Sequence, residues 1–307
     1  MPTITVSKNI SITSTTSRIF EVLSNFKHWP AWSPWLIADP EAKLTYSDNA
    51  KYYHWQSTRV GSGEMEITRE DLNHQIDYNL TFLSPWKSKA KVTFTLSQEG
   101  DQTYVTWTMK SSLPFFMFWM KGMMEVYIGL DFERGLKLLK DYLEFGKVQS
   151  TLSLEGTKAF EGTKYVGVSS TASFTDVSMT MRHDFGKIAE FAQQNLNITN
   201  GLMFSIYHKM DIKNKRFVYT ACVGVHNFPT KLPSDFTTGE IAPSSVFVVR
   251  HTGPYHHLGN AWSAGSMIER NKEFKKNKKF DPLEIYVNNP MEVDEKDLIT
   301  DIYFGAK

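Results

Sequence analysis

The chain has little cysteine, little net charge and no long uninterrupted apolar run, and each shortage excludes a class of protein. Its only cysteine is Cys222, so no disulfide can form within the chain, and a reducing compartment fits. Its 34 basic and 33 acidic residues leave a net charge of +1, so the chain as a whole has no pull toward nucleic acid or an anionic membrane. The start, MPTITVSKNISI, lacks the basic-then-apolar pattern of a secretory signal. We therefore expect a cytoplasmic protein that binds no nucleic acid.

The longest apolar segment also falls short of a membrane-spanning helix, which needs about 20 predominantly apolar residues. Residues 113–130, LPFFMFWMKGMMEVYIGL, are interrupted by Lys121 and Glu125. We expect no membrane span. The Met-rich part, 114–124, predicts either a core helix or a cover over the entrance of a cavity, because methionine adapts to varied ligands.

Motifs for phosphate, dinucleotide or acyl-transfer chemistry are missing as well. The sequence contains no GxSxG elbow, Walker loop or GxGxxG. His251, His256 and His257 straddle a Gly-Pro turn and lack the spacing of a metal site. A buried, inert thiol is the simpler interpretation of Cys222 than a nucleophile. We predict no catalytic residue, no metal and no cofactor.

The distribution of tryptophan indicates two domains. Seven of the eight tryptophans precede residue 120, and only Trp262 follows. The segment KVQSTLSLEGTKAFEGTK (147–164) is rich in Ser, Thr, Gly and Lys, which is typical of a linker leading into a strand. We predict a first domain over 1–147, a linker over 148–162 and a second domain over 163–307, each long enough to bury its own core.

The pattern of the first half predicts an α+β fold. A strand over 4–12 precedes a helix with apolar residues at helical spacing; strand-like segments follow from 43 to 110, and a long helix closes the half. This half resembles the polyketide-cyclase/START-like helix-grip superfamily in TSRIFEVLSNFKHWPAWSPW (16–35), VGSGEMEI (60–67), TYVTWTMKSSLPF (103–115) and DFERGLKLLKDYLE (131–144). The resemblance implies an antiparallel sheet around a long C-terminal helix, with a hydrophobic cavity between them. Candidate walls of that cavity are Trp32, Trp35, Trp55 and Trp107, although tryptophan also packs ordinary cores.

The second half contains a weak internal repeat of the order strand, helix, strand, strand. The third elements align as FSIYHK and LEIYVN, so that Ile206-Tyr207 matches Ile285-Tyr286. Two such units predict one sheet with pseudo-twofold symmetry, helices on one face and a groove along the dyad. The predicted elements are, in the first unit, 164–170, 179–195, 202–210 and 216–225, and, in the second, 244–252, 257–273, 282–288 and 298–304.

This half resembles GyrI-like effector-binding domains, which occur in multidrug-sensing regulators and gyrase-inhibitor-type proteins. The similar segments are VFVVRHTGPYHHLGNAW (246–262) and FDPLEIYVNNPMEVDEKDLITDIYFGA (280–306). In the family, an acidic residue on this strand meets cationic or polar groups of the ligand, and that position is Glu284 here. Alternation along the strand puts Leu283 and Ile285 on the opposite face from Glu284 and Tyr286. The other candidate ligand-binding residues are Tyr207, Tyr255 and Trp262; core packing is the alternative for the last two, and a solvent-facing glutamate is the alternative for Glu284.

Both resemblances point to the binding of small hydrophobic or cationic amphipathic molecules. A carboxylate among aromatic rings attracts lipophilic cations through its charge and through the ring quadrupoles. Two alternatives remain open: a cyclase-like or hydrolase-like enzyme that uses Glu284, and a gyrase-inhibitor-like module that binds a protein. A helix-turn-helix, the usual partner of this domain in regulators, is replaced by the helix-grip domain, so the resemblance does not imply a transcription factor. The sequence leaves the ligand, the oligomeric state and any coupling of the domains open.

Overall fold

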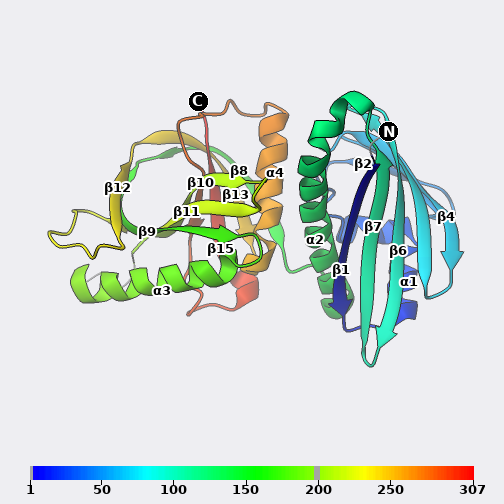
Figure 1. The fold of residues 1–307 in the computed structure, drawn as a ribbon, viewed down its shortest axis with the longest axis horizontal. Helices are drawn as coiled ribbons and strands as arrows, with labels where there is room; N and C mark the ends of the chain where they lie inside the picture. The colour runs from blue at the N-terminus through cyan, green and yellow to red at the C-terminus, as the bar shows by residue number, and fades with distance from the viewer. Residues whose placement is uncertain (1–2, 197–200) are drawn as a thin grey trace. The chain divides into compact units, whose positions relative to one another are not determined.

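The computed structural model describes residues 3–196 and 201–307, and the chain divides into two units, Met1–Thr151 and Leu152–Lys307 (Figure 1). The division falls inside the segment expected to be a linker. Most of that segment, 148–162, is instead strand β8 (Thr151–Phe160) of the second unit's sheet. The sequence did not predict this strand, because β8 is an edge strand that buries none of its residues. Its composition is therefore that of a loop.

The first unit is a seven-stranded antiparallel sheet in the order β1-β7-β6-β5-β4-β3-β2. A single long helix, α2 (Lys121–Phe145), packs against β1 and ends at Gly146, whose φ of 74° glycine adopts without strain (Figure 1). The predicted face of this helix is confirmed, because Phe132, Leu136 and Leu139 are buried in the core and Leu143 packs against it. The other elements are β1 (Thr3–Ile12), α1 (Thr16–Leu23), η1 (Phe26–Ala31), β2 (Lys43–Tyr46), β3 (Tyr52–Gln56), β4 (Ser62–Asp71), β5 (Gln75–Ser84), β6 (Ser88–Glu99), β7 (Gln102–Ser112) and η2 (Phe115–Met120).

The second unit is an eight-stranded sheet in the order β12-β9-β11-β10-β14-β15-β13-β8. The order of elements along the chain confirms the predicted repeat of strand, helix, strand, strand. The first repeat consists of β9 (Thr163–Ser173), α3 (Val177–Leu196), β10 (Met203–Asp211) and β11 (Arg216–Val225). The second repeat consists of β13 (Ser244–Thr252), α4 (Gly259–Arg270), β14 (Leu283–Tyr286) and β15 (Ile299–Gly305). The shorter elements are β12 (Thr237–Ile241), η3 (Tyr255–His257) and η4 (Glu295–Asp297).

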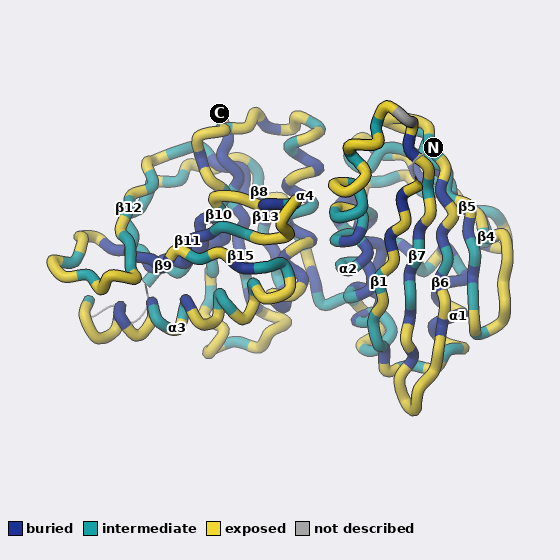
Figure 2. The backbone as a smooth tube through the Cα atoms, viewed as in Figure 1, coloured by how far each residue is buried: buried dark blue, intermediate teal, exposed yellow. Residues whose placement is uncertain are grey.

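Pairing of β10 with β14 joins the two repeats in the middle of this sheet. Helix α3 packs on β9 and β11, and α4 packs on β13 and β15. The buried positions of the strands are dark in Figure 2. They belong to two clusters: Tyr219 and Val223 pack in the cluster with α3, whereas Leu283 and Ile285 are in the other. Within the described residues, no helix combines the length and the apolar character needed to cross a bilayer.

Candidate functional site

Glu284 lies where the two repeats of the second unit meet. In the β10–β14 pair it is directly opposite Ser205, which is its counterpart in the FSIY/LEIY alignment. The first repeat has a serine at this position and the second has the glutamate, so a single carboxylate lies at the junction of the two repeats. The residues two positions on, Tyr207 and Tyr286, are symmetry mates and both reach it.

Three donors surround the Glu284 carboxylate. The hydroxyls of Tyr207 and Tyr286 donate to Oε2 at 3.0 and 2.9 Å, and the indole Nε1 of Trp262 donates to Oε1 at 2.5 Å. The Ser205 hydroxyl is 3.2 Å from that of Tyr286 and extends the network. Five residues from β10, β14 and α4 therefore form one hydrogen-bonded set. Four of them are predicted site residues, with Tyr207, Tyr286 and Trp262 around Glu284.

The Glu284 carboxylate is buried and has no cationic partner among the described residues. Glu284 is only 3% exposed, and in the described part of the chain no lysine or arginine forms an ion pair with it. Burial raises the pKa of Glu284, and the hydrogen bonds from Trp262, Tyr286 and Tyr207 oppose that rise. The predicted open groove is thus closed here, since aromatic side chains cover the carboxylate.

The walls of this site are aromatic and come from both helices. Trp262 of α4 packs edge-on against Tyr207, with ring centroids 4.9 Å apart. Tyr286 has two edge-on neighbours, Phe185 of α3 at 5.2 Å and Tyr255 at 5.6 Å. Burial and the nearby Glu284 raise the pKa of Tyr255 to about 12, so its phenol stays protonated and uncharged at neutral pH. All five predicted residues of this domain are therefore brought together.

Sequence reasoning missed the contribution of α3. Besides Phe185, Met181 of α3 contacts the Tyr207 hydroxyl at a sulfur–oxygen distance of 3.7 Å, and its sulfur is the alternative acceptor for the single proton that Tyr207 donates to Glu284. Also on α3, Asp184 is a second buried carboxylate; it accepts a 2.8 Å hydrogen bond from Tyr219, a ring neighbour of Tyr207 at 6.2 Å. The repeat was the available signal, because it places α3 on the same face of the sheet as α4.

The four tryptophans named as candidate cavity walls lie in or against the core of the first unit, between the sheet and α2, which is the packing that the sequence offered as the alternative. Trp107 stacks on Phe132 of α2 with ring centroids 4.0 Å apart. The rings of Trp32 and Trp35 each pack edge-on against Trp107, with centroid distances of 5.9 Å. Trp55 is buried on β3. The half-buried Trp35 donates to Asp131, whereas the buried indole N–H groups of Trp32 and Trp107 meet no acceptor in the described residues.

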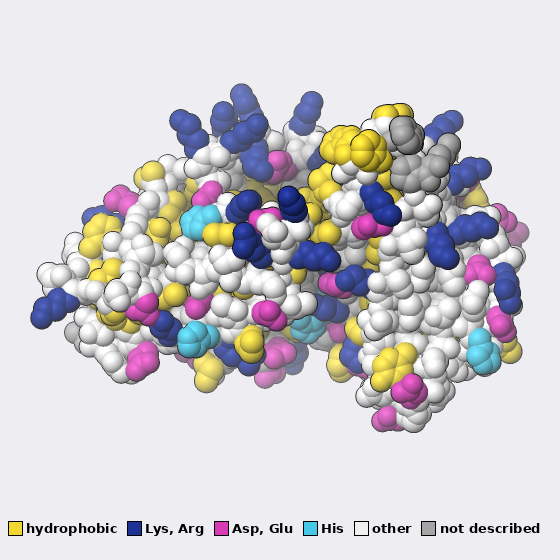
Figure 3. Space-filling view, viewed as in Figure 1, with side chains coloured by type: hydrophobic (Ala, Val, Ile, Leu, Met, Phe, Trp, Pro, Cys, Tyr) yellow, Lys and Arg dark blue, Asp and Glu magenta, His cyan; other side chains and the backbone are white. Residues whose placement is uncertain are grey.

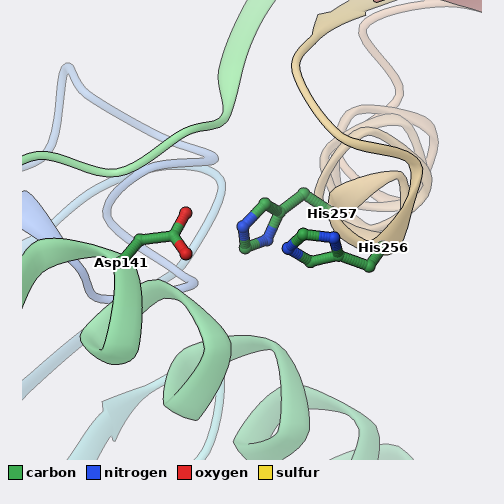
Figure 4. Close-up of side chains that lie close together, drawn as sticks. All are labelled: Asp141, His256 and His257. Atoms are coloured by element: carbon green, nitrogen blue, oxygen red, sulfur yellow. The ribbon is translucent and has the colours of Figure 1, made fainter. Parts of the chain in front are cut away.

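The histidine pair and the cysteine singled out in the sequence lie on η3 and β11 of the second unit. His256 and His257 lie side by side on turn η3, with ring centroids 4.2 Å apart, and both rings are drawn in Figure 4. Cys222 is buried on β11, and burial raises the pKa of its thiol, so the thiolate is not formed at neutral pH.

Each of the two units matches one protein family. Residues 3–144 match the family described as polyketide cyclase / dehydrase and lipid transport, and residues 157–307 match the family described as GyrI-like small molecule binding domain. The chain joins a START-like polyketide-cyclase domain to a GyrI-like domain, as the two resemblances implied.

Similar solved structures cover one half of the chain each. The EcmrR C-terminal domain is 17% identical, with 52% of this chain and 98% of that chain covered and a TM-score of 0.42. The Aha1 dimer from Colwellia psychrerythraea is 18% identical (47% and 98% covered, TM-score 0.36), and a START superfamily protein from Mycobacterium smegmatis is 18% identical (47% and 99% covered, TM-score 0.34). Comparison with curated proteins gave no match.

Proposed function

We propose that the second domain binds small lipophilic cations at Glu284, and that the whole chain is a cytoplasmic sensor or carrier of such molecules. One observation supports this most directly: an acidic side chain with a raised pKa is buried among aromatic rings, and no described residue gives it a positively charged partner. Removing a charge from water costs several kcal/mol, and proteins usually offset the cost with a counter-ion. A bound cation would supply the missing charge.

The surroundings of Glu284 fit an apolar cation better than a hydrated one. Tyr207, Tyr286 and Trp262 present ring surfaces as well as hydrogen bonds, and a cation over a ring face gains about 0.5–2 kcal/mol. Entry requires the covering side chains to move. Met181 and Phe185 of α3 are only partly buried, and the unbranched methionine changes conformation at low cost.

The first domain adds a second place where a small molecule would be stabilised. The indole N–H groups of Trp32 and Trp107 lie in the core between the sheet and α2 and make no hydrogen bond with the described residues. An unmet buried donor costs roughly 1–3 kcal/mol. A hydrophobic guest with an acceptor oxygen would relieve that cost, and the family description includes lipid transport.

Isothermal titration of the full chain with a lipophilic cation and a neutral molecule of similar shape tests the proposal for the second domain. Tetraphenylphosphonium and triphenylphosphine oxide are a suitable pair. We expect the cation to bind about tenfold more tightly or better, a preference that Glu284→Gln removes. Glu240→Gln is the matched control, because Glu240 is an exposed glutamate on β12 of the same sheet. Equal affinity of the wild-type protein for both molecules would contradict the proposal.

A hydrolase that uses Glu284 remains the second candidate. The sequence offered no acid–base partner for this residue, but the structure places two tyrosine hydroxyls within 3.0 Å of it. A carboxyl group with a raised pKa beside a phenol is a pairing suited to general acid–base catalysis. Turnover of a strained-ring electrophile that is lost in both Glu284→Gln and Tyr207→Phe would favour the enzyme over the carrier.

A further inference from the structure

One end of the first unit's sheet exposes large apolar side chains. Trp86, Phe116, Phe118, Trp119 and Met123, here called the aromatic tip, are 61%, 75%, 60%, 68% and 39% exposed. Figure 3 shows hydrophobic side chains gathered over the start of α2. Contiguous apolar surface of this kind is uncommon in water and marks a site of interaction.

Sheet topology brings three segments to this end. Trp86 lies in the turn between β5, which ends at Ser84, and β6, which begins at Ser88. Strand β7 runs antiparallel to β6 and ends at Ser112, close to the start of β6, and η2 follows at once. The turn after β4, which contains Leu72, is at the opposite end of the sheet.

Four exposed lysines lie in the turn and on the strand ends at the same end of the sheet as the aromatic tip. Lys87, Lys89, Lys91 and Lys110 form no ion pair with the described residues. Lys91 and Lys110 are direct partners across β6 and β7, an arrangement of like charges that is unfavourable without an anion nearby.

A hollow of about 530 Å³ on the sheet surface is lined by Lys89, Lys91 and Lys110, with Glu64 and Glu66 also on its wall. The acidic residue closest in sequence to the tip, Glu125, is held by Lys121 at 3.8 Å. The tip is therefore apolar, and the strand ends beside it carry more positive than negative charge, because four lysines outnumber Glu64 and Glu66.

We propose that the aromatic tip docks the protein on an anionic phospholipid surface, with Phe118 and Trp119 in the interface and the lysines on the headgroups. Tryptophan and phenylalanine favour the boundary between acyl chains and water, and lysine can extend its ammonium to the phosphates. No described helix could span a bilayer, so the contact is with the surface only. The inference is independent of the ligand at Glu284.

Co-sedimentation of the full chain with vesicles of phosphatidylcholine, alone or mixed with phosphatidylglycerol, tests this docking. We expect binding to the mixed vesicles that weakens with salt. The double variant Phe118→Ser/Trp119→Ser should weaken binding about tenfold or more, equal to ~1.4 kcal/mol. Leu72→Ser is the matched control, since Leu72 is 70% exposed at the other end of the same sheet, and it should leave binding unchanged.

The lysines have a separate readout. Lys89→Gln/Lys110→Gln should reduce the preference for anionic vesicles by about fivefold for each charge removed and leave the weak binding to phosphatidylcholine intact. Failure of the wild-type chain to sediment with anionic vesicles would overturn the proposal. So would an equal loss in Leu72→Ser, or a concentration-dependent dimer in sedimentation velocity that the tip variant abolishes, because the tip would then bind a second copy of the chain.

Discussion

Replacing Glu284 by glutamine should maintain or raise the stability of the second unit against unfolding and should weaken cation binding. Glutamine keeps the shape of the side chain and one acceptor oxygen for Trp262. Its amide nitrogen would donate to the hydroxyls of Tyr207 and Tyr286, which can rotate to accept. The substitution therefore removes the charge and little else.

The sign of the stability change follows from the pKa of Glu284. Hydrogen bonds to a charged group contribute about 1.5–3 kcal/mol each, and burial of the charge costs several kcal/mol. Because the pKa is raised, burial outweighs the three hydrogen bonds when the group ionises. Each unit of raised pKa corresponds to ~1.4 kcal/mol. We expect Glu284→Gln to equal or exceed the wild type in stability at neutral pH, by ~0–2 kcal/mol.

The same linkage fixes the pH dependence. A carboxyl group whose pKa is raised in the folded state binds more protons in the folded than in the unfolded protein. Its contribution to stability is therefore lost as pH rises through the pKa of the folded state, and it is regained as pH falls toward the ordinary glutamate pKa of about 4.5. The stability gap between variant and wild type should therefore be widest near neutral pH and close under mildly acidic conditions. Cation affinity of the wild type should fall over the same interval, because protonation removes the charge that attracts the cation.

Denaturant unfolding and cation titration between about pH 4 and pH 8 measure both effects. Cation binding should weaken by ~1–3 kcal/mol in Glu284→Gln, a loss of roughly 5-fold to 150-fold. A variant that loses more than ~2 kcal/mol of stability and binds cations as the wild type does would refute the reasoning. Glu284 would then be a structural hydrogen-bond acceptor that holds α4 to the sheet.

Four further expectations concern the rest of the chain. Burial and neighbouring imidazoles lower the pKa of His251 to about 3, so stability should fall as pH drops below about 6.5, and His251→Leu should flatten that slope in pH-dependent unfolding. Gly265→Ala should cost ~1–3 kcal/mol of stability and weaken cation binding, because the added Cβ would lie 2.1 Å from the ring of Phe304. Gly186→Ala is the control in the same unfolding measurements: its Cβ would meet open space, so it should be neutral or stabilising. The two units produced separately should each unfold cooperatively, and insoluble or molten halves would contradict their independence. Gel-shift assays of the full chain should show no submicromolar, salt-sensitive binding to duplex DNA.

Local sequence patterns were enough to place most elements. The apolar spacing of Phe132, Leu136, Leu139 and Leu143 predicted α2, because 3.6-residue periodicity depends only on neighbours along the chain. The repeat predicted the order of elements in the second unit, because similar segments such as FSIYHK and LEIYVN can be aligned along the chain without knowing the fold. Strand β8 was not predicted, because this edge strand buries none of its residues and therefore shows no apolar alternation. Its pairing depends on residues far away in the chain.

The candidate site divides in the same way. Alternation along LEIY established from sequence that Glu284 and Tyr286 share a face of β14, and the alignment with FSIY added Tyr207. The aromatic composition of the first half suggested a cavity, but ring-on-ring packing around Trp107 depends on side-chain volumes summed across several strands and a helix.

Only the tertiary structure decided that one carboxylate lies against both repeats. The direct pairing of Glu284 with Ser205 follows from the register between β10 and β14, which are separated along the chain by more than seventy residues and three other strands of the sheet. That register brings two tyrosines to the same oxygen and lets α3 and α4 cover the site. Sequence determined which side chains were available, and the pairing of distant strands determined that they surround a buried charge, because register is fixed by the whole core and not by local propensity.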